Sequence, residues 1–128
     1  MIKTYYITGD KIVINNIIEV AEKEGFKVSI YNCTNNSSYG IEFYKMSSQG
    51  RDFGFEITME SGMDEHDVAM LIDDYFESFD VSYETYIWLD NEGHGKNGAP
   101  YDMLDCYNDT KQCEKFIEEL SEAILKVY

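Results

Sequence analysis

Three short runs in the middle of the chain alternate apolar and polar residues. Successive side chains of a strand point to opposite faces, so this alternation predicts strands that each bury one face. The connecting segments "NNSSYG" and "SSQGRD" are rich in turn residues, which favours antiparallel hairpins. The sequence therefore predicts an antiparallel meander. Its buried face holds Phe26, Val28, Ile30, Ile41, Phe43, Phe53, Phe55, Ile57 and Met59, and its outward face holds Tyr31, Tyr44, Glu56 and Thr58.

The segment before the meander has two interpretations. In the first, Ile2 to Ile7 is a strand and Asp10 caps a helix that ends at Gly25. The apolar residues that recur at helical spacing in it are Ile14, Ile17, Ile18 and Ala21. In the second, "TYYI" pairs with "KIVI" as a hairpin, and the helix shortens to about Asn16 to Glu24. We expect the longer helix.

The second half of the chain has helical periodicity. Asp64 can cap a helix whose apolar residues are Val68, Leu71, Ile72, Tyr75, Phe76 and Phe79. The segment "DVSYETYIWLD" predicts a short helix that carries Tyr86, Ile87 and Leu89 inward. Pro100 is suited to the first turn of another short helix, through Tyr107. Asp109 with Gln112 matches a capping box, which predicts a final helix with a buried stripe of Cys113, Phe116, Ile117, Leu120, Ile124 and Val127.

The predicted order is thus β-α-β-β-β-α-α-α, an α+β fold. We expect residues 1–128 to form a single domain, in which helices pack on one face of an antiparallel three- or four-stranded sheet. The three cysteines, Cys33, Cys106 and Cys113, show no CxxC spacing, which favours reduced thiols. The N-terminus does not resemble a signal peptide, and no apolar run approaches the ~20 residues of a membrane span. We therefore expect a cytoplasmic protein that does not enter a membrane.

The formal net charge of −15 results from 25 acidic against 10 basic residues. No Lys or Arg occurs between Arg51 and Lys96. Affinity for nucleic acids comes largely from basic side chains that displace counterions, so direct binding of DNA or RNA is excluded. Anionic membranes are excluded for the same reason.

One stretch of this acidic region is a candidate binding surface. A solvated helix face is the ordinary explanation for such a cluster. The functional hypothesis is that ordered carboxylates imitate a phosphate array and attract a basic, nucleic-acid-binding protein at a salt-sensitive rate. The candidate residues are Asp64, Glu65, Asp67, Asp73, Asp74, Glu77, Asp80 and Glu84.

The loop "LDNEGHGKNGAP" is the second candidate. Asp90, Glu92 and His94 fit the first positions of a calcium loop, but Tyr101 stands where the bidentate glutamate is required. A transition-metal or hydrolytic site would need a further donor from elsewhere in the fold. The glycines, asparagines and proline have a structural explanation, because they suit a tight connector. We therefore expect a structured connector without a metal or cofactor, beside which Tyr83, Trp88 and Tyr101 are either core residues or interface anchors.

The block from Phe79 to Leu120 resembles a segment of small acidic uncharacterised proteins of bacterial genomes, phages and conjugative elements. The shared pattern runs from "FDV" to "WLD", then a glycine-rich connector with proline, then "IEEL". That group has no established activity, so the resemblance assigns no functional residue. It implies a mobile-element setting, in which acidic inhibitors of restriction or CRISPR systems are common. We therefore expect a non-catalytic binding or regulatory protein. A metal or hydrolytic site on the Asp90–Pro100 loop and a self-associating structural protein are the alternatives.

Overall fold

The computed structural model describes residues 4–7, 10–13, 15–32, 38–60, 62–97 and 99–127, with the backbone alone for residues 4–7, 10–13, 15 and 32. Its elements are β1 (Thr4–Ile7), β2 (Asp10–Val13), α1 (Asn15–Lys23), β3 (Lys27–Asn32), β4 (Ser38–Met46), β5 (Asp52–Glu60), α2 (Glu65–Ser78), α3 (Val81–Ile87) and α4 (Met103–Leu125). The fold belongs to the α+β class, as the sequence predicted.

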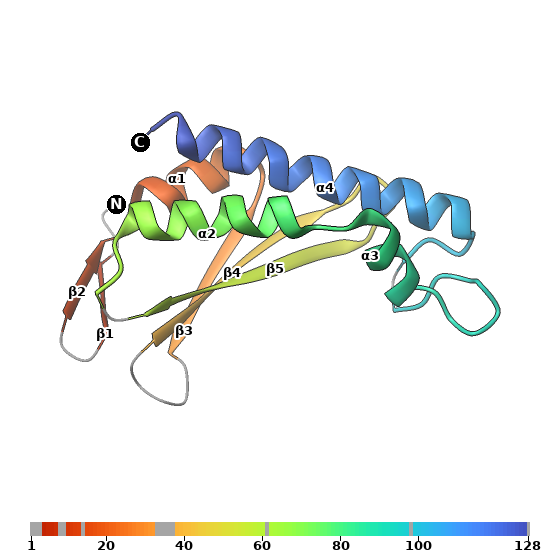
Figure 1. Ribbon diagram of the computed structural model, residues 1–128, viewed down its shortest axis with the longest axis horizontal. Coiled ribbons are helices and arrows are strands. Elements are labelled where there is room, and N and C mark those ends of the chain that lie inside the picture. Colours follow the sequence, from red (N-terminus) through yellow and green to blue (C-terminus); the bar gives the residue numbers. More distant parts are fainter. Residues whose placement is uncertain are drawn as a thin grey trace.

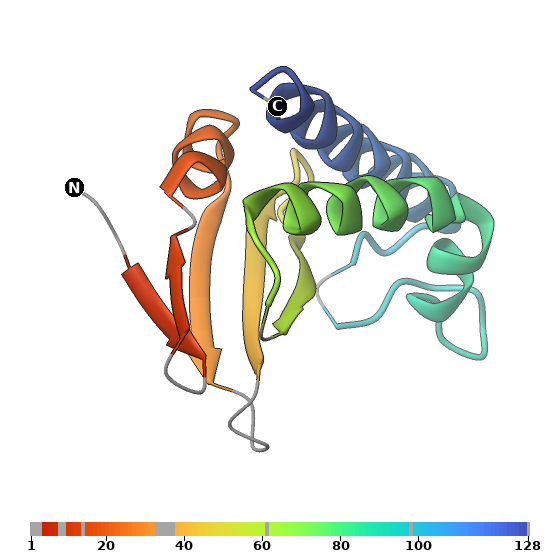
Figure 2. The same ribbon diagram turned by 60° about the vertical axis from the view of Figure 1, so that its left-hand side comes forward.

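The predicted meander forms the main sheet. Strands β3, β4 and β5 pair antiparallel in that order, and Phe43 of the central strand lies between Val28 and Phe55. Figures 1 and 2 show the helices gathered on one face of this sheet, with α2 and α4 side by side across it. No described helix covers the opposite face. The expected arrangement of helices on one face of an antiparallel sheet is therefore confirmed.

The N-terminal segment is a hairpin, so our preferred interpretation of it was wrong. Strand β1 pairs antiparallel with β2, from Thr4 opposite Val13 to Ile7 opposite Asp10, and the two form a sheet of their own. Asp10 is thus the first residue of a strand, and α1 begins only at Asn15. The β-branched and aromatic residues of both segments favour extended backbone, and this preference outweighed the helical spacing of the isoleucines.

Gly25 stops helix α1 after Lys23, as the sequence predicted. Gly25 has φ +90°, a conformation that favours glycine, and its N–H donates to the carbonyl of Glu22. The next N–H, of Phe26, donates to the carbonyl of Ala21 over 2.9 Å, which completes a Schellman-type end. Phe26 is buried, so the turn delivers an aromatic ring directly into the core.

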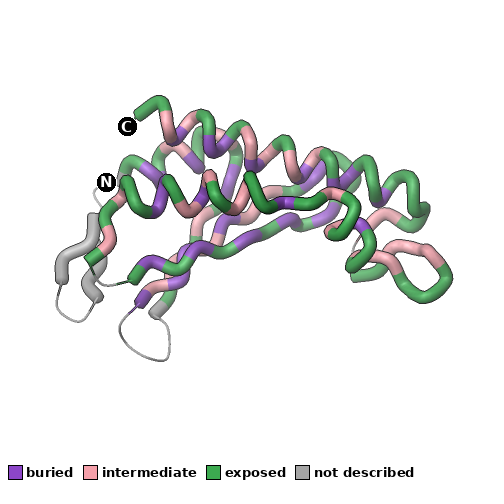
Figure 3. The backbone as a smooth tube through the Cα atoms, viewed as in Figure 1, coloured by how far each residue is buried: buried purple, intermediate pink, exposed green. Residues whose placement is uncertain are grey.

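The core lies between the sheet and the helices and is rich in aromatic rings. Burial alternates strictly along β5, which Figure 3 shows as alternating purple and green. The ring of Phe55 stacks on Phe43 at 5.0 Å and on Tyr75 of α2 at 4.6 Å between centroids. Phe26 meets both Phe43 and Phe55 edge-on. These contacts fix α2 above the sheet and thereby position its acidic outer side.

Two glycines shape the open face of the sheet. A Cβ on Gly40 would lie 2.4 Å from the Tyr31 ring, and one on Gly54 would lie 2.6 Å from the Tyr44 ring. Each tyrosine ring therefore lies flat over a glycine of the neighbouring strand. The Tyr31 hydroxyl also donates to Glu56 over 2.5 Å. The tyrosines predicted for the outward face thus cover the backbone of the sheet itself.

Helix α3 buries a different side of its surface from the one that we expected. Asp80 caps it by accepting hydrogen bonds from two backbone N–H groups of its first turn. The side chains of Tyr86 and Ile87 are exposed, although the sequence placed them inward, and Thr85 is buried in their place. The hydroxyl of Thr85 donates to the carbonyl of Val81 over 2.7 Å, so this polar side chain is satisfied within the helix.

Helix α4 is a single helix of 23 residues, whereas the sequence predicted a short helix through Tyr107 and a separate final helix. It begins after Asp102, so Pro100 precedes it rather than occupying its first turn. Asp109 does not cap a helix but lies in the helix interior, fully buried. The capping-box pattern failed here because the Asp109 carboxylate has a distant partner, Arg51, which local sequence rules do not consider.

Candidate functional site

The structure places the eight candidate acids along α2 and at the start of α3. Five are exposed and three are partly buried, and Figure 3 shows the corresponding exposed turns along α2. The exposed acids are Asp64, Asp67, Asp74, Glu77 and Asp80, and the partly buried ones are Glu65, Asp73 and Glu84. We call these eight residues the acidic surface.

Several of these acids also hold the fold together. Asp64 and Asp67 form a reciprocal capping box at the start of α2. Glu65 accepts the backbone N–H of Ile17 at 3.1 Å and so links α2 to α1. Asp73 accepts the hydroxyl of Ser121 at 3.0 Å and links α2 to α4. The same groups therefore stabilise the helices and form part of the acidic surface.

No Lys or Arg forms an ion pair with any residue of the acidic surface within the described part of the chain. Several basic side chains interact with groups outside the acidic surface. Lys45 donates to the carbonyl of Glu24 at 2.6 Å and lies over the Phe116 ring, while Lys115 pairs with Glu118. Arg51, the base that precedes the acidic interval, is buried. The negative charge of α2 is therefore not neutralised by these neighbours.

Glu84 lies where the acidic surface meets the interior. Burial raises the pKa of its carboxyl above the ordinary value, the charge of Arg51 opposes this rise, and Asp80 adds to it. The Arg51 charge therefore acts on the acidic surface at Glu84, a partly buried group.

The loop after α3 is organised around one carboxylate. Oδ1 of Asp90 accepts the backbone N–H groups of Glu92 at 2.8 Å and His94 at 2.9 Å. These two bonds lower the pKa of Asp90. Leu89 and Gly95 form a β-bridge, and the N–H of Gly95 donates to the carbonyl of Tyr101. Asp90 thus acts as an Asx-type turn residue, the structural role that we expected of the connector.

The loop does not bring its three candidate ligands together as a metal site. The Asp90 carboxylate turns toward the backbone, and the Glu92 carboxylate approaches Nδ1 of His94 only to 3.9 Å. The His94 ring stacks on Tyr101 with 4.3 Å between centroids. The described residues contain one group with metal-ligand spacing, at the start of α2: Asp64, His66 and Asp67. All three are exposed, and the two aspartates are the capping box already described.

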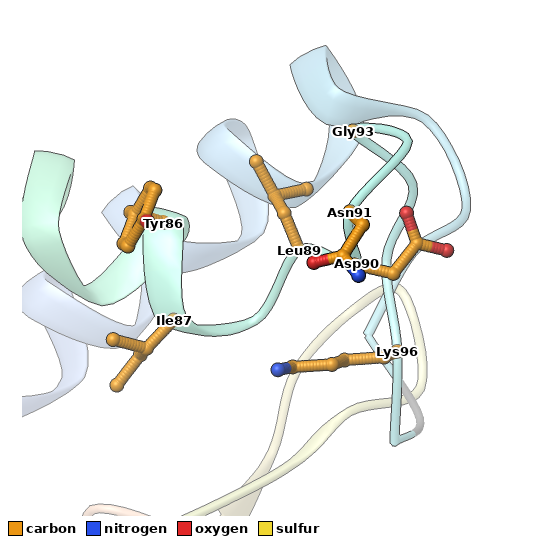
Figure 4. Close-up of a pocket in the computed structure, with 7 residues that line it drawn as sticks. All are labelled: Tyr86, Ile87, Leu89, Asp90, Asn91, Gly93 and Lys96. Carbon is orange, nitrogen blue, oxygen red and sulfur yellow. The ribbon is translucent and has the colours of Figure 1, made fainter.

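A pocket of about 580 Å³ lies between α3 and this loop. Figure 4 shows the Lys96 side chain extending toward Ile87, while the Asp90 carboxylate points away from Lys96. The lining residues are Tyr86, Ile87, Leu89, Asp90, Asn91, Gly93 and Lys96. The Asp90 carboxylate of this lining accepts two hydrogen bonds from the loop backbone.

A buried ion pair lies beneath α3. Nε of Arg51, in the turn between β4 and β5, is 2.9 Å from Oδ2 of Asp109 in α4, and the two side chains are 3% and 0% exposed. The contact is not well aligned as a hydrogen bond, so both carboxylate oxygens lack a hydrogen-bond donor among the described residues. Nη2 of Arg51 donates to the Cys113 sulfur at 3.0 Å, and Trp88 covers the guanidinium at 5.1 Å. This cluster ties the sheet to α4.

The two described cysteines are structural. Burial raises the pKa of Cys113 to about 11, despite the hydrogen bond and charge of Arg51, and also raises the pKa of Cys106. Both thiols are free and buried. A nucleophilic cysteine requires an accessible thiolate, so neither residue has the properties of one. Cys33 lies outside the described residues.

An apolar groove between α3 and the first turns of α4 was not predicted from the sequence. Its volume is about 460 Å³, and it is lined by Ser82, Thr85, Tyr86, Leu89, Met103, Leu104 and Tyr107. Helical periodicity could have predicted the α4 side of this groove. On one continuous helix, Met103, Leu104 and Tyr107 lie outside the buried stripe that includes Cys106, Thr110 and Cys113. Tyr83 and Tyr101, whose placement the sequence left open, are both exposed near this end of the molecule.

No protein-family model, no curated protein and no solved structure matches this chain. None of the described helices is both long enough and apolar enough to cross a bilayer.

Proposed function

We propose that this protein is a non-catalytic binding and regulatory protein, which presents its acidic surface to a basic, nucleic-acid-binding protein. The observation that carries the proposal is that, within the described part of the chain, the eight acids of α2 and α3 have no Lys or Arg partner. An inhibitor encoded on a mobile element fits this proposal, because its target would be a protein that binds nucleic acid.

The placement of the acids favours association from solution. Like charges on one helix are mutually unfavourable by a few tenths of a kcal/mol per pair, and a basic partner would relieve this repulsion. A single-sign surface also speeds diffusional encounter and makes the rate depend on salt. The caps at Asp64, Asp67 and Asp80 give three of the carboxylates fixed positions. A partner would therefore meet a partly ordered array of charge.

Affinity capture with charge-reversed variants tests the proposal. Asp74→Lys with Glu77→Lys reverses two exposed acids on α2 that make no described hydrogen bond or ion pair. The matched control is Glu119→Lys with Glu122→Lys on the exposed side of α4, which changes the net charge equally. Basic proteins are captured from a bacterial lysate at low and moderately high salt and identified by mass spectrometry.

The expected prey is retained by the native protein and by the α4 control. It is lost from the α2 variant, and from the native protein at the higher salt, because salt screens exposed charges. Equal capture by both variants, or capture that salt does not affect, contradicts the proposal.

A further inference from the structure

The apolar groove between α3 and the start of α4 leaves a contiguous set of apolar side chains in water. Tyr86 is 74%, Leu104 68% and Met103 58% exposed. Single exposed apolar residues are common, but a contiguous group that lines a groove marks a binding surface. The volume of about 460 Å³ lies in the range of small-molecule sites, which are mostly apolar with a few polar groups.

Among the described residues, those that line the groove include no charged side chain. Glu84 lies two residues before Tyr86 on α3, and Asp105 lies two residues before Tyr107 on α4. Residues two apart on a helix lie on nearly opposite sides of it. These two carboxylates therefore point away from the groove, although both helices carry acids elsewhere.

A base lies at the α4 end of the groove. Nζ of Lys111 is 5.5 Å from the ring centroid of Tyr107, which is a lining residue. Lys111 follows Tyr107 by four residues and Leu104 by seven, so all three share one side of α4. In the described part of the chain, Lys111 forms no ion pair, and Glu114 at i+3 is no exception. The ammonium group of Lys111 is thus available to a ligand.

Lys96 is a second base close to the groove. It lines the pocket described above, which shares Tyr86 and Leu89 with the groove. Figure 4 shows its side chain extending toward Ile87, while the Asp90 carboxylate points away from it. Lys96 forms no ion pair with any described residue. The charge close to the groove is therefore positive, on a protein whose net charge is −15.

We propose that this groove binds a single-chain carboxylate, a medium-chain fatty acid, with its carboxylate at Nζ of Lys111 and its chain along Leu104 and Met103. Lys111 and Met103 are eight residues apart on one helix, which corresponds to about 12 Å along the axis. Carbon–carbon bonds of about 1.5 Å give an extended chain of about ten carbons this length. The site is independent of the proposed function, because none of its lining residues belongs to the acidic surface.

A thin chain with one charge suits the groove better than a folded partner. Seven residues line the groove, whereas a protein interface uses about 20–30 residues from each partner. An acidic helix would bring several negative charges to a protein of net charge −15, and a second copy would bring the same net charge again. Like charges oppose association. A fatty acid brings a single negative charge, which lies against a base.

Isothermal titration calorimetry of the full chain with linear carboxylates tests the apolar part of the site. All ligands are kept below the concentration at which they form micelles. Full burial of one CH₂ group corresponds to about a fourfold gain in affinity. The open groove buries each group only in part, so lengthening hexanoate to octanoate, and octanoate to decanoate, is expected to tighten binding about tenfold at each step.

The head group is tested with two ligands of one chain length. Octanoate is expected to bind the native protein about tenfold more tightly than 1-octanol, because a carboxylate pairs with the ammonium of Lys111. In Lys111→Met, octanoate should bind as weakly as 1-octanol does. Lys126→Met, which removes one exposed positive charge just beyond the other end of α4, is the matched control and should leave the affinity unchanged.

Methyl signals locate the ligand. In a full chain that carries ¹³C-methyl methionine, decanoate is expected to shift the Met103 signal. The signals of exposed Met46 on β4 and buried Met59 on β5 should stay in place. Leu104→Ser is expected to weaken decanoate binding about tenfold, whereas Met46→Ser, a matched change on the open face of the sheet, leaves it unchanged.

Several results would overturn the proposal. They are no binding of decanoate, no gain with chain length, a Met103 signal that decanoate does not shift, and Lys111→Met that binds octanoate like the native protein. Cosedimentation with phosphatidylglycerol vesicles also overturns it, because the groove then belongs to a lipid surface rather than to a free fatty acid. A dimer that Leu104→Ser dissociates overturns it too, since a second copy then occupies the groove.

Discussion

Replacement of Asp109 tests how the buried ion pair supports the fold. Asn has nearly the shape of Asp but no charge, so Asp109→Asn leaves the Arg51 guanidinium buried without its counter-ion. The two side chains are almost completely inaccessible to water, with 2.9 Å between Nε and Oδ2. Breaking such a pair lowers the free energy of unfolding by about 3–5 kcal/mol, because the remaining charge is buried without a counter-ion. We expect about 3 kcal/mol, since Arg51 keeps its contacts with Cys113 and Trp88.

The assay is urea unfolding followed by circular dichroism. With a slope of about 2 kcal/mol per M, the midpoint should fall by about 1.5 M. Asp105→Asn is the matched control on the same helix. Asp105 is exposed, so this change should stay within about 0.5 kcal/mol of the native protein.

The double variant Arg51→Met with Asp109→Leu gives the more discriminating result. Replacing a buried pair by apolar residues of similar volume is often neutral or stabilising. The poor hydrogen-bond alignment here favours that outcome. The double variant should therefore be more stable than Asp109→Asn alone. A cost for Asp109→Asn under about 1 kcal/mol, or a double variant whose cost equals the sum of the single changes, would refute the reasoning.

Three further predictions concern titratable groups. In a Cys33→Ser protein, Cys106 and Cys113 should react with a thiol reagent only after denaturant is added, because burial raises the pKa of both thiols; fast reaction of the native protein contradicts this. Burial, with smaller contributions from nearby negative groups, raises the pKa of Tyr75 to about 12, so its contribution to stability is complete below pH 10 and disappears as the pH rises from 10 to 12. Unfolding curves should show a smaller loss of stability between pH 10 and 12 for Tyr75→Phe than for the native protein. Equal losses of stability would disprove the raised pKa of Tyr75. Asp90→Ala should speed hydrogen exchange at the loop amides bonded to this carboxylate about tenfold with unchanged global stability, and unaltered exchange would count against the turn.

Local patterns predicted the parts of the fold that local forces decide. The alternation in β3 to β5, the helix cap at Asp64 and the glycine stop at Gly25 are all confirmed, because each depends on residues close in sequence. The N-terminal segment satisfied two local patterns at once, and the choice between them was wrong. Helix α4 shows more clearly where local sequence patterns fail. Asp109 matched a capping pattern, but a side chain 58 positions earlier in the chain determined its role.

The candidate site was predictable only in part. The run of acidic residues without an intervening Lys or Arg identified the acidic surface. Helical periodicity placed Asp74 and Glu77 on the solvent side of the helix, and both are exposed. The groove was missed because exposure of Tyr86 depends on the direction in which α3 leaves α2. That direction is set by tertiary packing, on which the seven residues of α3 have little influence by themselves. The Asp90 loop could be recognised as a connector from its turn residues, and its hydrogen bonds agree with that role.

Trp88 is the single tryptophan of the chain, and its position makes it an intrinsic optical probe. Its ring lies against the Arg51 guanidinium, and it directly precedes Leu89, which lines the apolar groove. Loss of the buried ion pair should alter the polarity around this indole. Emission spectra therefore report unfolding and disruption of the ion pair without an attached dye, and the Asp105→Asn protein provides an unaltered baseline.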